Sequence, residues 1–302
     1  MIFRILQLNK LMTIANFPVL FLLFTSCLFP LRITIIKQSV FGYYNRAETG
    51  IKNRLASCAP LYTSFNSFGS SEKMSNFFSS GSSDSDIYIA MGTSALSACA
   101  HIKNKPVFFI FLDYPEIFPH QNSNFYGIAN DIDEHSKFQS FTGQCQKDNI
   151  RLQSILLFET MYQENSEYHA DILHNLVADK YPGCQAYILT LDPGFCRNET
   201  DFSSLLEDFF TEQKRQIDFF YITNDGNVVR FMNIILKYAR KHKVRIFGNY
   251  FASGFDIDYY YLIDYEKTGE RLGALIAGYL NNQKKNRFYW EYIADFQIIK
   301  KK

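Results

Sequence analysis

Two hydroxyl side chains, Thr93 and Ser94, stand directly after Gly92, where one local pattern gives way to another. The preceding stretch "IYIAM" has the β-branched and aromatic residues of a buried strand, and the following "ALSACA" favours a helix. A hydroxyl at such a junction can accept a hydrogen bond from the first helical turn. A helix N-terminus beyond a strand also attracts anions such as carboxylates. The junction therefore predicts either a helix cap or a ligand contact.

Asp225 stands at a similar strand-to-helix junction, in "YITNDGNVV". Its carboxylate could accept a hydrogen bond from an ammonium or hydroxyl group, or it could cap the next helix or shape an Asp-Gly turn. Tyr114 could stack on a ring. The remaining candidates for ligand contact share a place at predicted strand ends or crossings: Gln38, Ser39, Tyr114, Asn130 and Asn249.

Catalytic and metal-binding patterns are not found in the sequence. There is no GxSxG, HExxH, Walker-type or GxGxxG motif. His169 and His174 lie five residues apart, which puts them on different faces of a helix, and the other histidines lack metal-ligand spacing. The acidic stretch "DIDEH" at 131–135 is typical of a helix start. We therefore expect no catalytic residues, no metal and no cofactor.

Five cysteines follow the N-terminal segment, and none forms a CxxC pair: Cys58, Cys99, Cys145, Cys184 and Cys196. Cys184 and Cys196 are candidates for a disulfide if the protein is exported. Buried free thiols are the preferred interpretation, because cysteine is among the most buried residue types.

The N-terminal segment has the pattern of an export signal. Arg4 and Lys10 precede an uncharged stretch over 11–31, which is most apolar over 19–24. The sequence "FTSC" ends in Cys27 and resembles a bacterial lipobox, with Phe24 in place of the usual leucine. We expect residues 1–27 to be a signal peptide and Cys27 to be lipidated. An uncleaved signal anchor is the alternative.

Composition predicts an ordinary globular protein with more than one core. The chain has 302 residues, of which 47% are hydrophobic and 20% charged, and its net charge is +1. A chain of this length usually divides into two domains. The basic C-terminal tail is mixed with acidic and aromatic residues, so a nucleic-acid partner is not expected.

Strand and helix patterns alternate along the chain, which predicts an α/β protein with doubly wound, mostly parallel sheets. Helical spacing aligns Val228, Phe231, Met232, Ile235 and Tyr238 on one face. Strands are predicted at 31–38, 60–68, 87–91, 105–112, 152–159, 185–191, 217–225 and 244–250.

Several stretches, taken in order over residues 33–285, resemble the substrate-binding lipoproteins of ABC transporters, in the group that includes tryptophan and tyrosine binders. They are "DIYIAMGTSAL", "KPVFFIFLDYP", "FYGIAND", "FFYITNDGNVV" and "IDYEKTGERLGALIAGYLNNQK". The sequence departs from the family at 37–41, at 113–115, and in a shortened segment before the last helix. These departures leave the ligand's identity open.

The resemblance implies a two-lobed type I periplasmic-binding-protein fold with three crossings between lobes and the ligand in the cleft. Lobe one would comprise residues 31–125 and 252–282, and lobe two residues 126–251 and 283–302. The implied function is that of an exported, lipid-anchored solute-binding protein, which delivers a small ligand, such as an aromatic amino acid, to an ABC permease. Two alternatives stay open: a surface lipoprotein that serves as an interaction module without ligand, and an exported α/β enzyme acting on a small polar substrate.

Overall fold

Each half of the alternating pattern forms a sheet of its own. The computed structural model describes residues 30–80, 84–112, 115, 118, 122–161, 164–212, 216–222, 226–249, 254–281 and 288–301. The chain divides into two units. Unit 1 contains the described residues up to 130 and within 265–291, and unit 2 contains those within 131–264 and 292–301.

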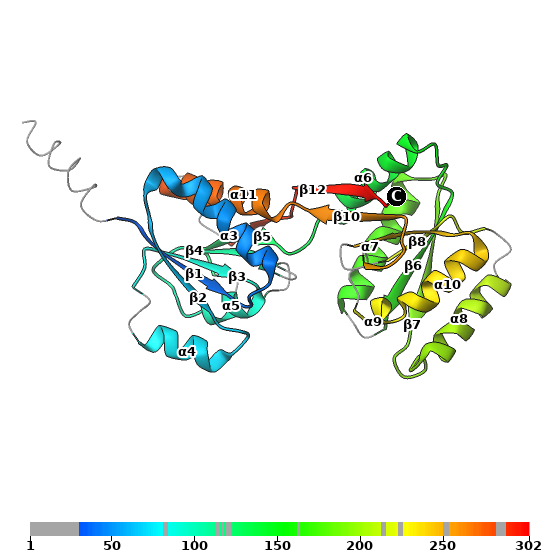
Figure 1. Ribbon diagram of the computed structural model, residues 1–302, viewed down its shortest axis with the longest axis horizontal. Coiled ribbons are helices and arrows are strands. Elements are labelled where there is room, and N and C mark those ends of the chain that lie inside the picture. The colour runs from blue at the N-terminus through cyan, green and yellow to red at the C-terminus, as the bar shows by residue number, and fades with distance from the viewer. Residues whose placement is uncertain are drawn as a thin grey trace, which may run out of the picture. The chain divides into compact units, whose positions relative to one another are not determined.

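Unit 1 is built on a parallel sheet with strand order β11-β5-β4-β3-β1-β2. Figure 1 labels β1 to β5 of this sheet. Every residue of β3, β4 and β5 is buried, as expected for strands covered on both faces. The elements of unit 1 are β1 (Arg32–Lys37), α3 (Gly42–Leu55), a 3₁₀ turn (Ala56–Cys58), β2 (Leu61–Asn66), α4 (Ser71–Ser79), β3 (Ile87–Met91), α5 (Thr93–Ala98), β4 (Val107–Leu112), β5 (Phe125–Ala129), α11 (Tyr265–Leu280) and β11 (Tyr289–Glu291).

Helices α3 and α11 lie side by side over the sheet of unit 1 (Figure 1). Two glycines set this close approach. A Cβ atom added at Gly50 would lie 2.0 Å from the backbone oxygen of Glu266, and one added at Gly269 would lie 2.0 Å from that of Ala47. The two backbones are therefore in direct contact, which only glycine permits at these positions.

Unit 2 repeats the design with strand order β12-β10-β9-β8-β6-β7. Its described strands pair in parallel except for the edge strand β12, which is antiparallel to β10. The elements are α6 (Glu134–Lys147), β6 (Ser154–Thr160), α7 (Glu164–Lys180), β7 (Gln185–Leu191), α8 (Glu199–Glu212), β8 (Phe219–Tyr221), α9 (Gly226–Arg230), α10 (Met232–His242), β9 (Arg245–Gly248), β10 (Tyr259–Ile263) and β12 (Phe296–Lys300).

The apolar face predicted for 227–243 is confirmed as core, because its aligned residues are all buried in unit 2. The helix itself is interrupted: α9 ends at Arg230 and α10 begins at Met232. In α7 the core positions are Leu173 and Val177, whereas Ile172 and Leu176 are half-buried.

The unit boundaries differ at their edges from the lobes expected from the sequence. Strand β5, expected to open lobe two, pairs with β4 in unit 1. Strand β10, expected in lobe one, pairs with β9 and β12 in unit 2. Strand β11, expected in lobe two, pairs with β5 in unit 1. In each case the strand belongs to the unit that contains the strand with which it forms backbone hydrogen bonds.

The expected signal peptide and the lipidation site Cys27 lie outside the described residues. Within the described part of the chain, no helix is both long enough and apolar enough to cross a membrane. Cys184 and Cys196 are free thiols, so the candidate disulfide is wrong for this structure, and Cys58, Cys99 and Cys145 are free as well.

Candidate functional site

The carboxyl ends of β1 and β3 meet at one edge of the unit 1 sheet, because the strands are parallel neighbours. Gln38 follows β1, and its side-chain Oε1 accepts a hydrogen bond from the backbone N–H of Ser94 at 3.1 Å. Gly92 lies between them with a φ of 97°. A Cβ atom there would lie 2.5 Å from Gln38 Oε1 and 2.7 Å from the hydroxyl of Tyr44.

Helix α5 begins at Thr93, and the cap position belongs to Gly92, which makes no side-chain cap bond. The expectation that Thr93 or Ser94 is the cap is therefore wrong, since both lie inside the first turn. Instead, the Gln38 side chain accepts a hydrogen bond from one backbone N–H group of that turn, the N–H of Ser94. A glutamine distant in sequence thus does what a local hydroxyl was expected to do.

A cluster of aromatic rings stands at the same edge of unit 1, and we call it the ring cluster. The ring of Tyr43 lies 5.7 Å from that of Phe41, 5.4 Å from that of Phe111 and 5.2 Å from that of Tyr265. Tyr44 contacts Phe111 at 5.7 Å and is buried, whereas Phe41 is 60% exposed. The cluster therefore runs from the core to the surface, beside Gln38.

Phe111 adopts a left-handed backbone conformation, with a φ of 64°. The register between β4 and β5 shifts at this residue, between Ile110 and Leu112, so β4 has a bulge at its carboxyl end. A bulky residue in this conformation costs of the order of 1–3 kcal/mol and is retained where surrounding structure requires it. Here the bulge turns the ring of Phe111 towards Tyr43 and Tyr265.

We expect Gly92→Ala to destabilise unit 1 by roughly 1–3 kcal/mol, because the positive φ strains any residue with a Cβ atom. The new methyl group would also press on the Gln38 and Tyr44 side chains, whose tips can move. Urea denaturation measures the loss. Gly42→Ala is the matched control, because a Cβ atom there meets nothing within 4 Å. Equal stability of the two variants would contradict the account of Gly92.

The remaining predicted ligand residues are scattered among described and undescribed parts of the chain. Tyr114 and Asp225 lie outside the described residues. Ser39 is half-buried beside Gln38. Asn130 follows β5, and its backbone N–H donates to the oxygen of Leu112 at the edge described above. Asn249 is buried after β9, at the carboxyl edge of unit 2.

A pocket of about 530 Å³ runs between α4 and α5 from the same edge of unit 1. Thr93 and Ser94 line one end of it, and His101 lines the other. Its remaining wall is made of Gly69, Met74, Ser75, Phe78, Ser79, Ser97 and Ala98. Thr93 and Ser94 thus face a hollow, with hydroxyl groups and apolar side chains along its length.

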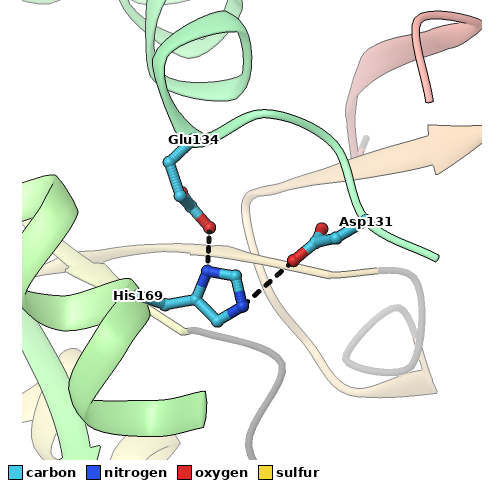
Figure 2. Close-up of side chains that lie close together, drawn as sticks. All are labelled: Asp131, Glu134 and His169. Carbon is cyan, nitrogen blue, oxygen red and sulfur yellow. Dashed lines mark ion pairs between the residues drawn. The ribbon is translucent and has the colours of Figure 1, made fainter. Parts of the chain in front are cut away.

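Unit 2 holds a buried charged cluster that the sequence did not predict (Figure 2), and we call it the ion cluster. His169 Nε2 lies 3.2 Å from Asp131 Oδ2, and His169 Nδ1 lies 3.0 Å from Glu134 Oε1. The ammonium of Lys137 lies 2.6 Å from Glu134 Oε1 and 3.4 Å from Asp131 Oδ1. The side chains of Glu134 and Lys137 are 6% and 5% exposed, so these charges are almost fully removed from water.

The ion cluster lies at the carboxyl edge of the unit 2 sheet. Helix α7 follows β6, and α6 precedes it, so the first turns of both helices lie where β6 ends. The ammonium of Lys137 also lies 5.1 Å from the ring centre of Tyr261 on β10. Tyr221, the last residue of β8, has a buried hydroxyl without a hydrogen-bond partner among the described residues.

Burial opposes the charges of His169, Glu134 and Lys137, and the opposite charges around these three groups outweigh it. Burial would lower the pKa of His169, but the Glu134 and Asp131 carboxylates raise it above its usual value. Burial would raise the pKa of Glu134, but Lys137 and His169 hold it below its usual range. For Lys137 the two carboxylates likewise outweigh burial and raise the pKa.

A metal ion does not fit the ion cluster. Asp131, Glu134 and His169 each offer one ligand atom, and these atoms lie within 4.8 Å of one another. The ammonium of Lys137 already stands at ion-pair distance from both carboxylates. A divalent ion bound there would be repelled by this ammonium at short range. The ammonium of Lys137 already supplies a positive charge between the two carboxylates.

Part of the ion cluster could have been found from the sequence. Glu134 and Lys137 have the i, i+3 spacing of a helical ion pair. Asp133 is the N-cap of α6 and accepts a hydrogen bond from the Ser136 N–H, as an acidic helix start predicts. The contribution of His169 depends on the packing of α7 against α6, for which the sequence has no local signal.

Comparison by sequence matches the chain to no family model and to no curated protein. Comparison of structures does find similar proteins. A ligand-free, open substrate-binding protein with adhesive properties from Clostridium difficile is 16% identical, with a TM-score of 0.74 over 90% of this chain and 92% of that one. An ABC domain from Streptococcus pneumoniae in complex with L-Trp is 13% identical, with a TM-score of 0.54 over 89% and 91%.

This is the type I periplasmic-binding-protein fold. The same fold is shared by a protein described as a LacI transcriptional regulator from Bacteroides fragilis, which is 13% identical with a TM-score of 0.53 over 90% of this chain and 97% of that one. Identities this low establish the fold alone. The α/β architecture expected from the sequence is thus confirmed, and function has to be argued from the residues.

Proposed function

We propose that the chain is a solute-binding protein that captures a small ring-bearing molecule at the carboxyl edge of unit 1. The observation that carries this proposal is the ring cluster. Its outermost ring, Phe41, is 60% exposed and stacks on Tyr43 with the two planes 17° apart. A large aromatic side chain held in place by other rings, yet left open to solvent, is suited to stack on a ligand.

The polar groups beside the ring cluster favour a ligand without net charge. Gln38, Ser39, Thr93 and Ser94 offer amide and hydroxyl groups at this edge. Lys37, at the end of β1, is paired with Glu48 at 2.8 Å, and Lys52 shares the same carboxylate at 2.6 Å. A zwitterion with an aromatic side chain, such as an aromatic amino acid, matches rings together with neutral donors and acceptors.

Delivery to an ABC permease, export and attachment of a lipid at Cys27 complete the proposal. The fold supports this role, because several substrate-binding proteins share it. The lipobox-like "FTSC" supports the anchor. Radiolabelled palmitate supplied to a bacterial expression host tests the anchor: label is expected in the wild-type protein and not in a Cys27→Ser variant.

Removing the outermost ring should weaken ligand binding without affecting folding. We expect Phe41→Ala to lower the affinity for L-tryptophan or L-tyrosine about tenfold, because an aromatic pair contributes about 0.5–1.5 kcal/mol beyond its buried area. Isothermal titration calorimetry measures both dissociation constants. Phe195→Ala is the matched control, since Phe195 is 83% exposed and lies in unit 2.

The calorimetry separates the role of the cluster from the identity of the ligand. Binding of an aromatic amino acid that weakens in Phe41→Ala alone supports the proposal. Binding that is equal in all three proteins would place the ligand elsewhere. Binding of a sugar but of neither amino acid would keep the solute-binding role and correct the ligand class.

A further inference from the structure

The ion cluster joins helix α7 to the segment where the chain enters unit 2. Asp131 is the first residue of that unit. Its backbone oxygen accepts a hydrogen bond from the N–H of Ile293, near the point where the chain enters the unit for the last time. Its carboxylate lies 3.2 Å from His169 on α7. The cluster thereby connects two entering segments to a helix of the core.

The position of His169 between two carboxylates favours two protons on its ring. Nδ1 and Nε2 each face a carboxylate oxygen, at 3.0 and 3.2 Å (Figure 2). A neutral imidazole has one N–H group, and its second nitrogen carries a lone pair. That lone pair would face a carboxylate at close range. The arrangement is therefore attractive on both sides only for the imidazolium ion.

The charge balance leads to the same conclusion. Asp131 and Glu134 supply two negative charges, and Lys137 supplies one positive charge. With a neutral His169, one buried negative charge remains uncompensated, which is costly at low exposure. An imidazolium ion supplies the second positive charge, so that the two carboxylates are matched by two cations. The charged and titratable groups that face His169 or the ion pairs around it are, among the described residues, Asp131, Glu134, Lys137, Tyr221 and Tyr261.

We propose that the ion cluster is a proton-binding latch: protonated His169 bridges Asp131 and Glu134 and holds the entry segment of unit 2 against α7, and loss of the proton releases it. The two tyrosines do not replace the missing positive charge. Lys137 pairs with the same carboxylates and stays charged throughout. The latch is independent of the ligand proposed for unit 1.

The sign of the pH effect follows from His169. Its pKa in the folded protein is raised above the ordinary value of 6.5. The stabilisation is therefore complete below about pH 6.5 and is lost as the pH rises through the raised pKa. The entry segment 131–134 should become more mobile in mildly alkaline solution, and exchange its amide hydrogens faster than pH alone accounts for.

The most direct test is an NMR titration of the full chain labelled with ¹³C at the histidine ring. We expect the His169 resonance to titrate above 6.5, the ordinary value for a histidine side chain. Titration of His169 at or below 6.5 would overturn the proposal.

A second test uses Asp131→Asn, which keeps the size of a side chain that is 23% exposed. We expect this variant to fold and to show a lower His169 pKa. It should also lose the alkaline increase in hydrogen exchange over 131–134. Asp133→Asn is the control, because Asp133 caps α6 and takes no part in the ion cluster. An unchanged His169 titration in Asp131→Asn would also overturn the latch.

Discussion

Replacing Gly269 with alanine is expected to destabilise unit 1 by about 3 kcal/mol. The new Cβ atom would lie 2.0 Å from the backbone oxygen of Ala47 and 2.7 Å from its carbonyl carbon. These atoms belong to helix backbone and cannot rotate away as a side chain can. Helix α11 would have to separate from α3, and overpacking of this kind costs about 1–3 kcal/mol and occasionally more.

Chemical denaturation followed by circular dichroism measures this loss, and Gly143→Ala supplies the control. Gly143 lies within α6 in unit 2, where a Cβ atom meets nothing within 4 Å. Alanine there should stabilise the helix by up to about 1 kcal/mol, because it restricts the unfolded chain. The two substitutions are chemically identical and should have opposite signs. A Gly269→Ala protein as stable as wild type would show that α3 and α11 are not in backbone contact.

Replacing Lys137 with methionine is expected to cost unit 2 about 3–5 kcal/mol. Methionine has the length and flexibility of lysine but no charge. The variant would leave the carboxylates of Glu134 and Asp131 buried with His169 as their one remaining cation among the described residues. Breaking a buried ion pair on one side is costly because the other charge loses its partner.

Denaturant titrations of three proteins check this expectation. Lys137→Met should lose most of the stability, and the double variant Lys137→Met/Glu134→Gln should recover part of it, because the buried charges are then removed together. Lys180→Met at the exposed end of α7 is the control and should change stability by less than about 0.5 kcal/mol. A Lys137→Met protein with wild-type stability would contradict the burial of the ion cluster.

The sequence predicted those parts of the fold in which the residue pattern within a single strand or helix is distinctive. The buried strand over 87–91 has no polar residue, which is typical of a parallel strand covered on both faces. The apolar face predicted over 228–238 repeats at helical spacing, and all its members are buried, although it is divided between α9 and α10. In such segments local propensity and tertiary packing favour the same structure, so the element can be predicted from a single sequence.

Other strands were missed because their patterns are weak or depend on partners. Strand β11 has three residues, and its place is fixed by pairing with β5. Strand β12 is an antiparallel edge strand in a tail of alternating charge and aromatic residues. Strand β5 lies where the boundary between the two lobes was expected, and prolines and polar residues precede it in the sequence. Each needed a neighbouring strand to be recognised.

In the candidate sites, too, features formed by neighbouring residues were predicted, and features formed by residues distant in sequence were not. The strand-to-helix junction after β3 was predicted from Gly92, Thr93 and Ser94, because strand, glycine and hydroxyls are adjacent in sequence, and a ligand contact there stays a prediction. The capping role of Gln38 was missed, since this residue lies 56 positions from Ser94. The ring cluster was missed too, because its members come from β4 and from the starts of α3 and α11 and meet only in the folded unit.

A thermal-shift screen tests most directly whether the protein binds a small molecule. The protein without residues 1–27 would be heated with amino acids, sugars, nucleosides or small peptides. A ligand at a hundred times its dissociation constant stabilises by about 2.7 kcal/mol, which is several degrees. We expect such a shift for one class of ligand, and most directly for aromatic amino acids. No shift with any class, together with no small molecule released on denaturing extraction, would contradict the account and favour an interaction module without a ligand.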